Sequence, residues 1–427
     1  MKKVTLLFLI QVGLFITVFA QKNANTDLQM ASPEKVGFSP TRLKQIDKHL
    51  QNYIDKQWIA GAVGIVARNG KIVYYNSLGY SNIANKTQMK KDDIFHIMSM
   101  TKPIVSLAAM ILFEENRFML DEPVSNYIPE FKNLQVLDSI NKDSSFVATP
   151  TRKPLTIRHL LTHTSGIGYG FIYPNAKIIY TKAGIPDSPS DLKGKQIKMS
   201  EKMKILASMP LLHQPGERWT YGLSTDMLGY LVEVISGQSL AEFVTQRILQ
   251  PLQMNDTHFG LPKEKENRLA SVYYDNGKGG IGEYPKADRE NLIQGGRVYF
   301  SGGSCLVSTA MDYLKFAQML LNGGELNGTR IVSRKTVELM TTNHIGGLVI
   351  SAYGEKFGLG FSVPSEQSGY KNLGASNSFG WGGALTTNFW FDKKEGIAAV
   401  LMTQIAPTSH GDVVDKFRIA VYQALND

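Results

Sequence analysis

The fold is decided by the stretch Phe95-His96-Ile97-Met98-Ser99-Met100-Thr101-Lys102-Pro103, which introduces a long apolar run from Ile104 to Phe113. That run is hydrophobic nearly all round, which is typical of a helix buried inside a domain. Ser99 and Lys102 are three residues apart, so their side chains share one face of such a helix. The lysine amine can therefore take the proton that a serine must lose to become a nucleophile. Pro103 is tolerated because N–H groups in the first helical turn lack intrahelical partners.

The S-x-x-K spacing alone does not single out Ser99, because it also occurs at Ser139, Ser190 and Ser368. Those three serines lie in stretches rich in Ser, Gly, Asp, Pro or Lys, which are typical of solvated loops. Only Ser99 opens a buried apolar helix. The sequence therefore predicts that Ser99 and Lys102 are the reactive pair.

The first 20 residues have the pattern of a secretory signal peptide. Lys2 and Lys3 precede an apolar run from Val4 to Phe19, and Val18-Phe19-Ala20 is an acceptable cleavage site. An uncleaved membrane anchor is the alternative, although the run is short for a membrane span. We expect a periplasmic or secreted protein, with cleavage near Ala20 and no stable membrane span afterwards. Residues 21–32 then form a linker, and residues 33–427 form one domain.

Composition excludes several classes of protein. The chain has 427 residues and a formal net charge of +9, with its basic residues scattered rather than gathered among aromatic ones, so no nucleic-acid partner is predicted. Cys305 is the single cysteine, so no internal disulfide is possible, and a buried small residue is its expected role. A core of this size is stable without a disulfide. Oligomeric state is not readable from the sequence.

The sequence predicts β-strands at both ends of the domain. The segments 62–68 and 71–78 flank Asn69-Gly70, a strong signal for a two-residue hairpin. Near the other end, 384–391 and 396–402 read as two more strands, followed by a helix over 413–425. No alternation of strands and helices links the two ends. An α+β fold is therefore predicted, with one antiparallel sheet built from both termini and flanked by helices.

The middle of the chain, about 96–300, reads as mainly helical. Helices are expected near 156–161, over 224–236 with Gly237 as a stop, and over 240–249, and another is expected beyond this region at 311–321. The stretch 166–211 carries aromatic residues, Tyr169 among them, between Gly, Pro and Ser. We expect it to be an irregular binding loop or lid, with a disordered excursion as the alternative.

Two further elements complete the predicted site. Tyr221 follows Gln214-Pro215-Gly216-Glu217-Arg218-Trp219-Thr220 and precedes a helix, so it is placed to reach a cleft and carry a proton. A phenol beside an ammonium group is favoured in its ionised form. Trp381-Gly382-Gly383 is the other element, because glycines at a strand edge allow close approach of a substrate. The N–H groups of Ser99 and Ala384 are predicted to form an oxyanion hole.

Taken together, these motifs resemble the serine β-lactamase and penicillin-binding-protein superfamily, in its class C-like branch. The resemblance rests on the Phe95–Pro103 stretch, on Leu120-Asp121-Glu122-Pro123-Val124, on Leu155 to Gly166, on Pro215 to Tyr221 and on Phe379 to Gly383, in family order over roughly residues 33 to 425. It implies a β-lactamase/transpeptidase-like fold and catalytic roles for Ser99, Lys102 and Tyr221.

Departures from the family pattern bear on the substrate. The class C pattern Tyr-x-Asn is here Tyr221-Gly222-Leu223, and Trp381 stands where the family usually has Lys or His. A site without that cation should bind anionic lactams poorly and favour neutral acyl groups. The chain is most similar in this respect to the carboxylesterase members, with Trp381, Gly382, Gly383, Leu223 and Tyr169 as expected substrate-binding residues.

The sequence thus predicts a serine hydrolase that acts on small-molecule esters through an acyl-enzyme on Ser99. The alternatives are a β-lactamase or a D-amino-peptide hydrolase with a lactam or peptide substrate, and a catalytically silent cell-wall-binding protein. No G-x-S-x-G motif of an α/β-hydrolase is present. His159 and His163 lack the H-E-x-x-H pattern and are expected to be structural, so no metal or cofactor is predicted.

Overall fold

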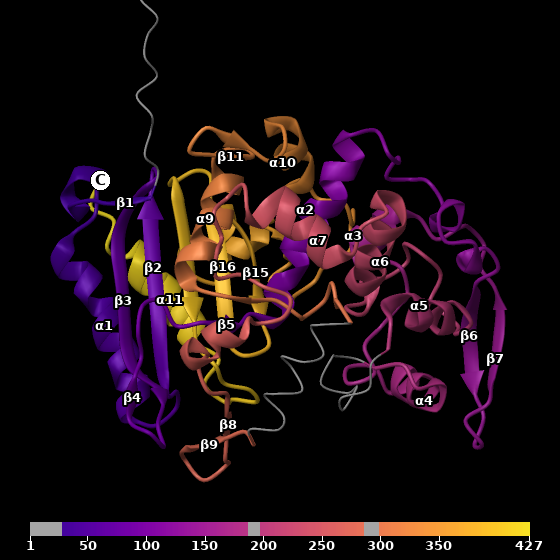
Figure 1. Cartoon of the computed structure of the whole chain (residues 1–427), viewed down its shortest axis with the longest axis horizontal. Helices are drawn as coiled ribbons and strands as arrows, with labels where there is room; N and C mark the ends of the chain where they lie inside the picture. Colours follow the sequence, from indigo (N-terminus) through magenta and orange to yellow (C-terminus); the bar gives the residue numbers. More distant parts are fainter. Residues whose placement is uncertain (1–27, 187–196, 286–298) are drawn as a thin grey trace, which may run out of the picture.

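A sheet organises one half of the molecule, on the left in Figure 1, in the computed structural model, which describes residues 28–186, 197–285 and 299–427. Its strand order is β1-β3-β2-β17-β16-β15-β14-β13, and β4 pairs with β3 beyond this path. The strands are β1 (Gln29–Met30), β2 (Gly61–Arg68), β3 (Lys71–Asn82), β4 (Thr87–Gln88), β13 (Lys356–Phe357), β14 (Ser362–Val363), β15 (Ser378–Gly383), β16 (Thr387–Asp392) and β17 (Ile397–Met402). The predicted signal peptide and residues 21–27 of the predicted linker lie outside the described residues.

The two ends of the chain meet in the middle of this sheet. β2 and β3 form the predicted hairpin, in which Asn69 and Gly70 have φ values of 49° and 74°, as a two-residue turn of this kind requires. β17 lies antiparallel to β2, with Ile397 opposite Arg68. The predicted α+β fold with a sheet from both termini is therefore confirmed. The short β1 adds a parallel pair, with Gln29 opposite Lys71, so the sheet is mixed rather than wholly antiparallel.

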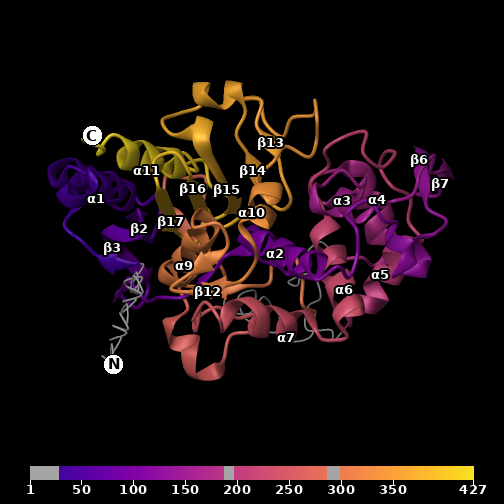
Figure 2. The same cartoon turned by 90° about the horizontal axis from the view of Figure 1, so that it is seen from above.

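Helices cover both faces of the sheet. Figure 2 shows α1 (Pro40–Asp55) and α11 (Val413–Tyr422) on one side of the strands, and α2 (Thr101–Glu114) and α9 (Ala310–Leu321) on the other. The buried side chains accordingly form two main clusters, one under α1 and α11 and a larger one around α2 and α9. The larger cluster also includes residues from the helices in the middle of the chain, and the predicted site residues Tyr221 and Trp381 pack against it.

Helix α2 is the buried helix that the sequence predicts. Every residue from Thr101 to Leu112 is buried. The helix starts at Thr101, immediately after a turn of 3-10 helix, Met98–Met100, so Ser99 lies two residues before the α-helix begins. Pro103 lies in the first turn of α2, where its missing N–H costs no helical hydrogen bond.

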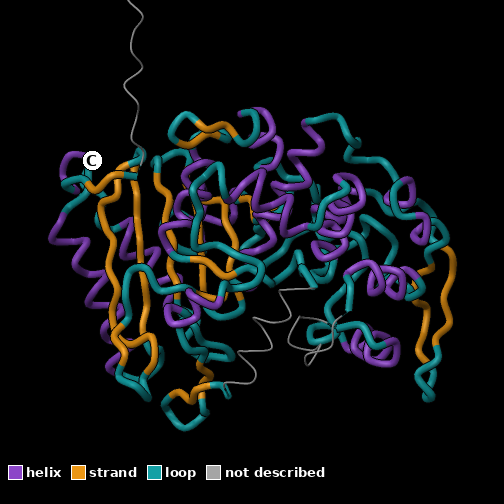
Figure 3. Tube along the Cα trace, in the orientation of Figure 1, coloured by secondary structure: helices purple, strands orange, loops and turns teal. Residues whose placement is uncertain are grey.

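The middle of the chain forms the helical half, on the right in Figure 3. Its helices are α3 (Ile157–Leu161), α4 (Pro174–Ala183), α5 (Met199–Ala207), α6 (Ser224–Ser236) and α7 (Leu240–Val244), the last continued by a π-helical turn at Thr245–Leu249; α10 (Arg334–Met340) follows later in the chain. Short strand pairs complete the structure: β5 (Phe95–His96) with β10 (Val307–Ser308), β6 (Gln135–Ile140) with β7 (Phe146–Pro150), β8 (Tyr273–Asp275) with β9 (Ile281–Glu283), and β11 (Glu325–Leu326) with β12 (Thr329–Arg330).

The stretch predicted to be an irregular lid, 166–211, is partly helical, and that part of the prediction is wrong. It contains α4 and α5. Helix α4 has Pro174 at its first position and Gly184 in the left-handed conformation after its end, a common pair of helix boundaries. Residues 187–196 of this stretch lie outside the described residues.

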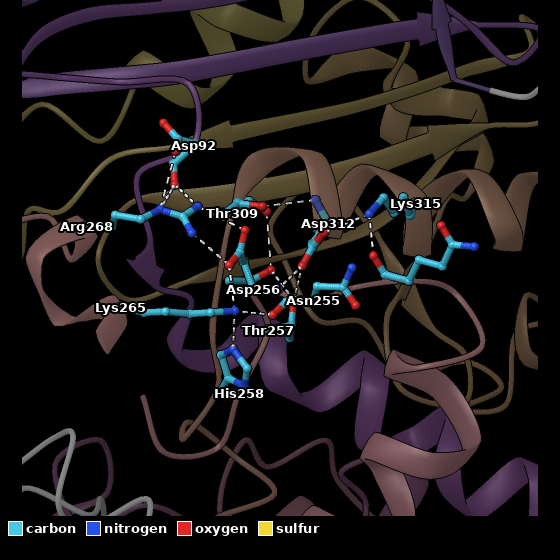
Figure 4. Close-up of polar contacts among 12 residues, drawn as sticks. Asp92, Asn255, Asp256, Thr257, His258, Lys265, Arg268, Thr309, Asp312 and Lys315 are labelled. Carbon is cyan, nitrogen blue, oxygen red and sulfur yellow. Dashed lines mark hydrogen bonds and ion pairs between the residues drawn. The ribbon is translucent and has the colours of Figure 1, made fainter. Parts of the chain in front are cut away.

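A polar cluster anchors the loop after α7 to α9 (Figure 4). The Asp256 carboxylate accepts two hydrogen bonds from Arg268, at 2.8 and 2.9 Å, and pairs with Lys265 at 2.8 Å. The backbone N–H of Asp256 donates to buried Asp312 of α9 at 2.7 Å. The main chain of His258 then pairs with β10, which pairs with β5. The cluster therefore supports the strand that leads into the 3-10 turn carrying Ser99.

Candidate active site

Ser99 lies in the 3-10 turn between β5 and α2, and its side chain is partly exposed. The preceding residue, Met98, has φ of 46°, which is unusual for a residue with a side chain. Backbone strain of this kind is concentrated at functional sites, where the surrounding structure holds it in place. β5 and the buried start of α2 flank this turn, so they fix the direction in which the Ser99 hydroxyl points.

Lys102 is the buried partner of Ser99. Its side chain is 1% exposed. Its Nζ atom lies 3.2 Å from Ser99 Oγ, 3.0 Å from Tyr169 Oη and 2.9 Å from the carbonyl oxygen of Gly303. An ammonium group has three N–H donors, and these three oxygens can receive all of them. The predicted pairing of the serine with the lysine is thus present in the geometry.

Tyr221 lies against the same ammonium group. Lys102 Nζ is 4.6 Å from the centroid of the Tyr221 ring. The Tyr221 hydroxyl accepts a hydrogen bond from Trp381 Nε1 at 3.2 Å, and its backbone N–H donates to the Tyr173 hydroxyl at 3.1 Å. One hydrogen bond therefore holds the Tyr221 hydroxyl, and another holds its main chain.

The glycine motif ends β15 next to the nucleophile. Trp381, Gly382 and Gly383 pair with β16. A Cβ atom on Gly383 would collide with the carbonyl oxygen of Ile97, two residues before Ser99, so only glycine fits there. Ala384 follows at once and is exposed. The end of β15 therefore lies against the segment that leads into the turn carrying Ser99.

Aromatic rings wall the site. Trp219 stacks on Tyr221, with ring centroids 5.7 Å apart and planes at 15°, and Phe357 meets Trp381 edge-on at 5.2 Å. His163 lies 4.9 Å from the Tyr221 ring. Burial, and secondarily the charge of Lys102, lower the pKa of His163 well below its ordinary value. The imidazole is therefore neutral, and the wall is apolar at the pH of an ordinary assay.

The comparisons with known proteins agree with this geometry. The model of the family described as Beta-lactamase matches residues 46–424. The chain belongs to the β-lactamase family. Protein Rv1367c of Mycobacterium tuberculosis is 31% identical over 84% of this chain and 89% of its own length. Esterase EstB of Burkholderia gladioli is 29% identical over 88% of this chain and 94% of its own length.

A solved structure shows the same fold. EstCE1, described as a hydrolase with promiscuous acyltransferase activity, is 28% identical and has a TM-score of 0.75, over 90% of this chain and 99% of that chain. Together, these findings confirm the predicted family, its β-lactamase/transpeptidase-like fold and the enzyme class of a carboxylesterase-like serine hydrolase.

Two predicted substrate-binding residues lie deeper than the sequence suggests. In this member of the β-lactamase family, Tyr169 is 4% exposed and its hydroxyl contacts Lys102. Leu223 is 1% exposed and caps the start of α6, packed in the core. Sequence reasoning placed Tyr169 in a lid and did not pair it with the lysine, because the two residues are 67 positions apart. It also missed the Gly303 carbonyl, whose only sequence signal is the Gly302-Gly303 pair.

The other S-x-x-K serines are placed differently. Ser139 is exposed, as expected, but it lies in strand β6 and not in a loop, and Ser190 lies outside the described residues. Ser368 is fully buried, so its assignment to a solvated loop is wrong. Its hydroxyl accepts from the backbone N–H of Ser365, 2.9 Å away, and caps a short 3-10 helix.

The histidines and the cysteine have structural partners. His159 Nδ1 accepts from the Thr156 backbone N–H at 3.1 Å, within a capping box, and His163 Nε2 lies 3.3 Å from Thr225 Oγ1. Cys305 is buried, as expected, and burial raises the pKa of its thiol. Within the three described ranges there is no group of three His, Cys, Asp or Glu residues that could hold a metal ion, and no helix there could span a membrane.

Proposed function

We propose that this enzyme hydrolyses carboxylic esters through an acyl-enzyme formed on Ser99. The observation that carries the proposal is the position of the buried Lys102 amine, which lies 3.2 Å from Ser99 Oγ, beside the aromatic residues that surround the site. This spacing is within reach for proton transfer from a serine to a general base. The esterase name of the 29%-identical relative EstB points to the same class of substrate.

The geometry supports the following order of steps. With Lys102 as the free amine, its Nζ atom takes the Ser99 proton, directly or through Tyr221, and Ser99 Oγ attacks the ester carbonyl carbon. The N–H groups of Ser99 and Ala384 receive the negative charge that develops on the carbonyl oxygen, an interaction worth about a hundred- to a thousandfold in rate per donor. The C–O bond to the leaving alcohol breaks as Tyr221 gives that alcohol a proton, which Tyr221 recovers from Lys102. Water then attacks the acyl-enzyme and releases the acid.

Trp381 favours esters over β-lactams. Its indole N–H is used by the Tyr221 hydroxyl, and its ring closes the aromatic wall with Phe357. A substrate carboxylate here would meet apolar rings instead of the cation that other family members supply. Leu223 likewise offers no amide in place of the family's asparagine, and hydrogen bonds left unmade in a buried site cost about 1–3 kcal/mol each. A neutral ester loses neither interaction.

The test is an acylation assay with matched serine variants. The parent protein should be labelled by a fluorophosphonate at Ser99 and should hydrolyse p-nitrophenyl esters, while Ser99→Ala should do neither. Ser368→Ala is the control, because Ser368 shares the S-x-x-K spacing but lies away from Lys102; it should keep both activities. Turnover of p-nitrophenyl esters by Ser99→Ala at the parent rate would refute the proposal.

A second assay separates the proposed substrate class from its alternatives. A coloured cephalosporin and a D-alanyl peptide are offered beside a short-chain ester, and the acyl-enzyme is detected by intact mass. Faster acylation by the ester is expected. Faster acylation by the lactam or the peptide would reassign the enzyme to the β-lactamase or D-amino-peptide hydrolase alternatives, and no acylation by any probe would favour the catalytically silent protein.

We also propose that the enzyme is exported to the periplasm or secreted, on the pattern of residues 1–20. Expression of the full chain in a bacterial host and N-terminal sequencing of the protein outside the cytoplasm should give a start near Gln21. A protein retained in the cytoplasm with Met1 intact would refute export.

A further inference from the structure

A buried carboxylate that the steps above do not use lies behind Lys102. Asp226, in the first turn of α6, is 1% exposed. Its Oδ1 atom accepts a hydrogen bond from Ser301 Oγ, whereas its Oδ2 atom is buried without a hydrogen-bond partner among the described residues. An incompletely satisfied carboxyl group in a protein interior is costly, so its presence at this place calls for a reason.

A chain of hydrogen bonds joins this carboxylate to the ammonium group. Ser301 Oγ donates to Asp226 and accepts from the Gly303 backbone N–H at 3.1 Å. The carbonyl oxygen of Gly303 accepts from Lys102 Nζ at 2.9 Å. One serine hydroxyl and one glycine residue therefore separate the carboxylate from the amine, and all four groups are buried.

The loop that makes this connection is packed too closely for any residue but glycine. A Cβ atom on Gly303 would lie 2.6 Å from Asp226 Oδ2 and 2.8 Å from Tyr169 Oη. A Cβ atom on Gly302 would collide with the carbonyl oxygen of Thr225. The Gly303 α-carbon thus fills the space between the carboxyl group and the phenol that contacts Lys102, which places Asp226 close behind the site.

The surroundings of Asp226 contain one strong compensating charge. The pKa of Asp226 is raised overall, because burial outweighs the hydrogen bond from Ser301 and the charge of Lys102, which act in the opposite direction. Buried Cys305 also faces it, and the Asp226 charge adds to the burial that raises the pKa of the Cys305 thiol. Lys102 is the cation that acts on the carboxylate here.

In the part of the chain that the structure describes, the groups that contact Lys102 from its other sides include no carboxylate. They are the Ser99 hydroxyl, the phenols Tyr169 and Tyr221 and the His163 imidazole, which burial keeps neutral. Within the described ranges, Asp226 is therefore the acidic side chain that balances the buried ammonium group.

We propose that Asp226 is a positioning residue of the active site: an ionised counter-charge that holds the Lys102 ammonium against the Gly303 carbonyl and sets the pH at which the reactive group loses its proton. This inference rests on the proposed acyl transfer at Ser99. It does not depend on whether Lys102 or a phenol finally holds the proton, because a nearby negative charge opposes the loss of a proton from either.

The sign of the effect follows directly. Replacing the carboxylate by a neutral amide of the same shape removes a negative charge, so each proton nearby is lost more easily. The acid limb of the pH profile of kcat/KM, which reports the free enzyme, should move to lower pH by about one unit or more, as is typical of a close opposite charge. If Asp226 had only a structural role, Asp226→Asn would change the maximum kcat/KM and the melting temperature of the protein, but the pH of the acid limb would stay the same.

The experiment measures kcat/KM for p-nitrophenyl butyrate from pH 4.5 to 9 in the parent protein, in Asp226→Asn and in Asp392→Asn. Asp392 is the matched control, because it is also fully buried but bonds to Tyr422 on the opposite face of the sheet. A shift of the limb to lower pH in Asp226→Asn, with none in Asp392→Asn, is expected. An unmoved limb, or one that moves to higher pH, would overturn the inference.

A second variant and a labelling control make each outcome interpretable. Should Asp226→Asn not fold, Asp226→Ser removes the same charge with a smaller polar group, and its limb is read in the same way. Fluorophosphonate labelling of the parent protein separates the two proposals: absence of label at Ser99 means that the acyl-enzyme proposal has failed, whereas a labelled parent with an unmoved variant limb means that only the role of Asp226 has failed.

Discussion

Replacing Tyr169 by phenylalanine tests whether the Lys102 contacts matter for catalysis. The substitution removes only the hydroxyl that lies 3.0 Å from Lys102 Nζ and leaves the ring, which stacks on Phe171, in place. Because Lys102 is 1% exposed, water cannot freely replace the lost oxygen. One of the three N–H groups of the ammonium then loses its partner.

The size of the effect follows from this geometry. A hydrogen bond to a charged group contributes about 1.5–3 kcal/mol, and about 1.4 kcal/mol corresponds to a tenfold change in rate. If the Lys102 Nζ atom must be held beside Ser99 for acylation, kcat/KM for a p-nitrophenyl ester should fall by about ten- to a hundredfold in Tyr169→Phe. The free energy of unfolding, measured in denaturant, should fall by a similar amount.

The control is a tyrosine hydroxyl with a charged partner elsewhere. Tyr74 is buried on the opposite face of the sheet and donates to Asp47 at 2.8 Å. Tyr74→Phe should lower stability comparably but leave kcat/KM of the folded protein within about twofold, because it touches nothing at the site. A Tyr169→Phe enzyme that acylates as fast as the parent protein would refute the reasoning, since it would show that Lys102 does not need this partner.

Three more outcomes follow from the structure. Burial raises the pKa of Asp256, but the hydrogen bonds from its two basic partners outweigh burial and lower the pKa to about 2. Asp256→Asn should therefore lower the free energy of unfolding by about 1 kcal/mol at pH 7, after discounting for solvent screening. The melting temperature of the variant should approach that of the parent protein as the pH falls from about 4 to about 2. Trp381→Phe removes the N–H that donates to Tyr221 and should lower kcat/KM about three- to tenfold, with the melting temperature little changed. Gly383→Ala should abolish fluorophosphonate labelling in a protein that still melts cooperatively, because the added methyl group collides with the Ile97 carbonyl beside the nucleophile; normal labelling would contradict the assigned position of the strand end.

Local signals in the sequence predict the elements of this fold well where one short segment decides the outcome. Asn69-Gly70 fixes a hairpin turn because few other residue pairs adopt two consecutive positive φ values. Helix α6 occupies the predicted 224–236, and Gly237 ends it with φ of 74°. The helices inside 166–211 were also visible in principle: Met199, Lys202, Met203 and Leu206 of α5 are buried with the spacing of one helical face. Glycine, proline and serine around them obscured that pattern.

The same distinction between local and distant sequence signals applies to the active site. The spacing of Ser99 and Lys102 is local, so the sequence predicts their contact. The other two partners of the ammonium group come from positions 67 and 201 residues away, and no pattern within either segment specifies which oxygen reaches the lysine. Yet those distant partners determine how firmly a buried cation is held, since an ammonium group removed from water needs all of its N–H donors satisfied. The S-x-x-K motif therefore predicts the reactive pair, whereas the packing of Tyr169 and of the Gly303 loop supplies the contacts on which the proposed effects on pH dependence and rate rest.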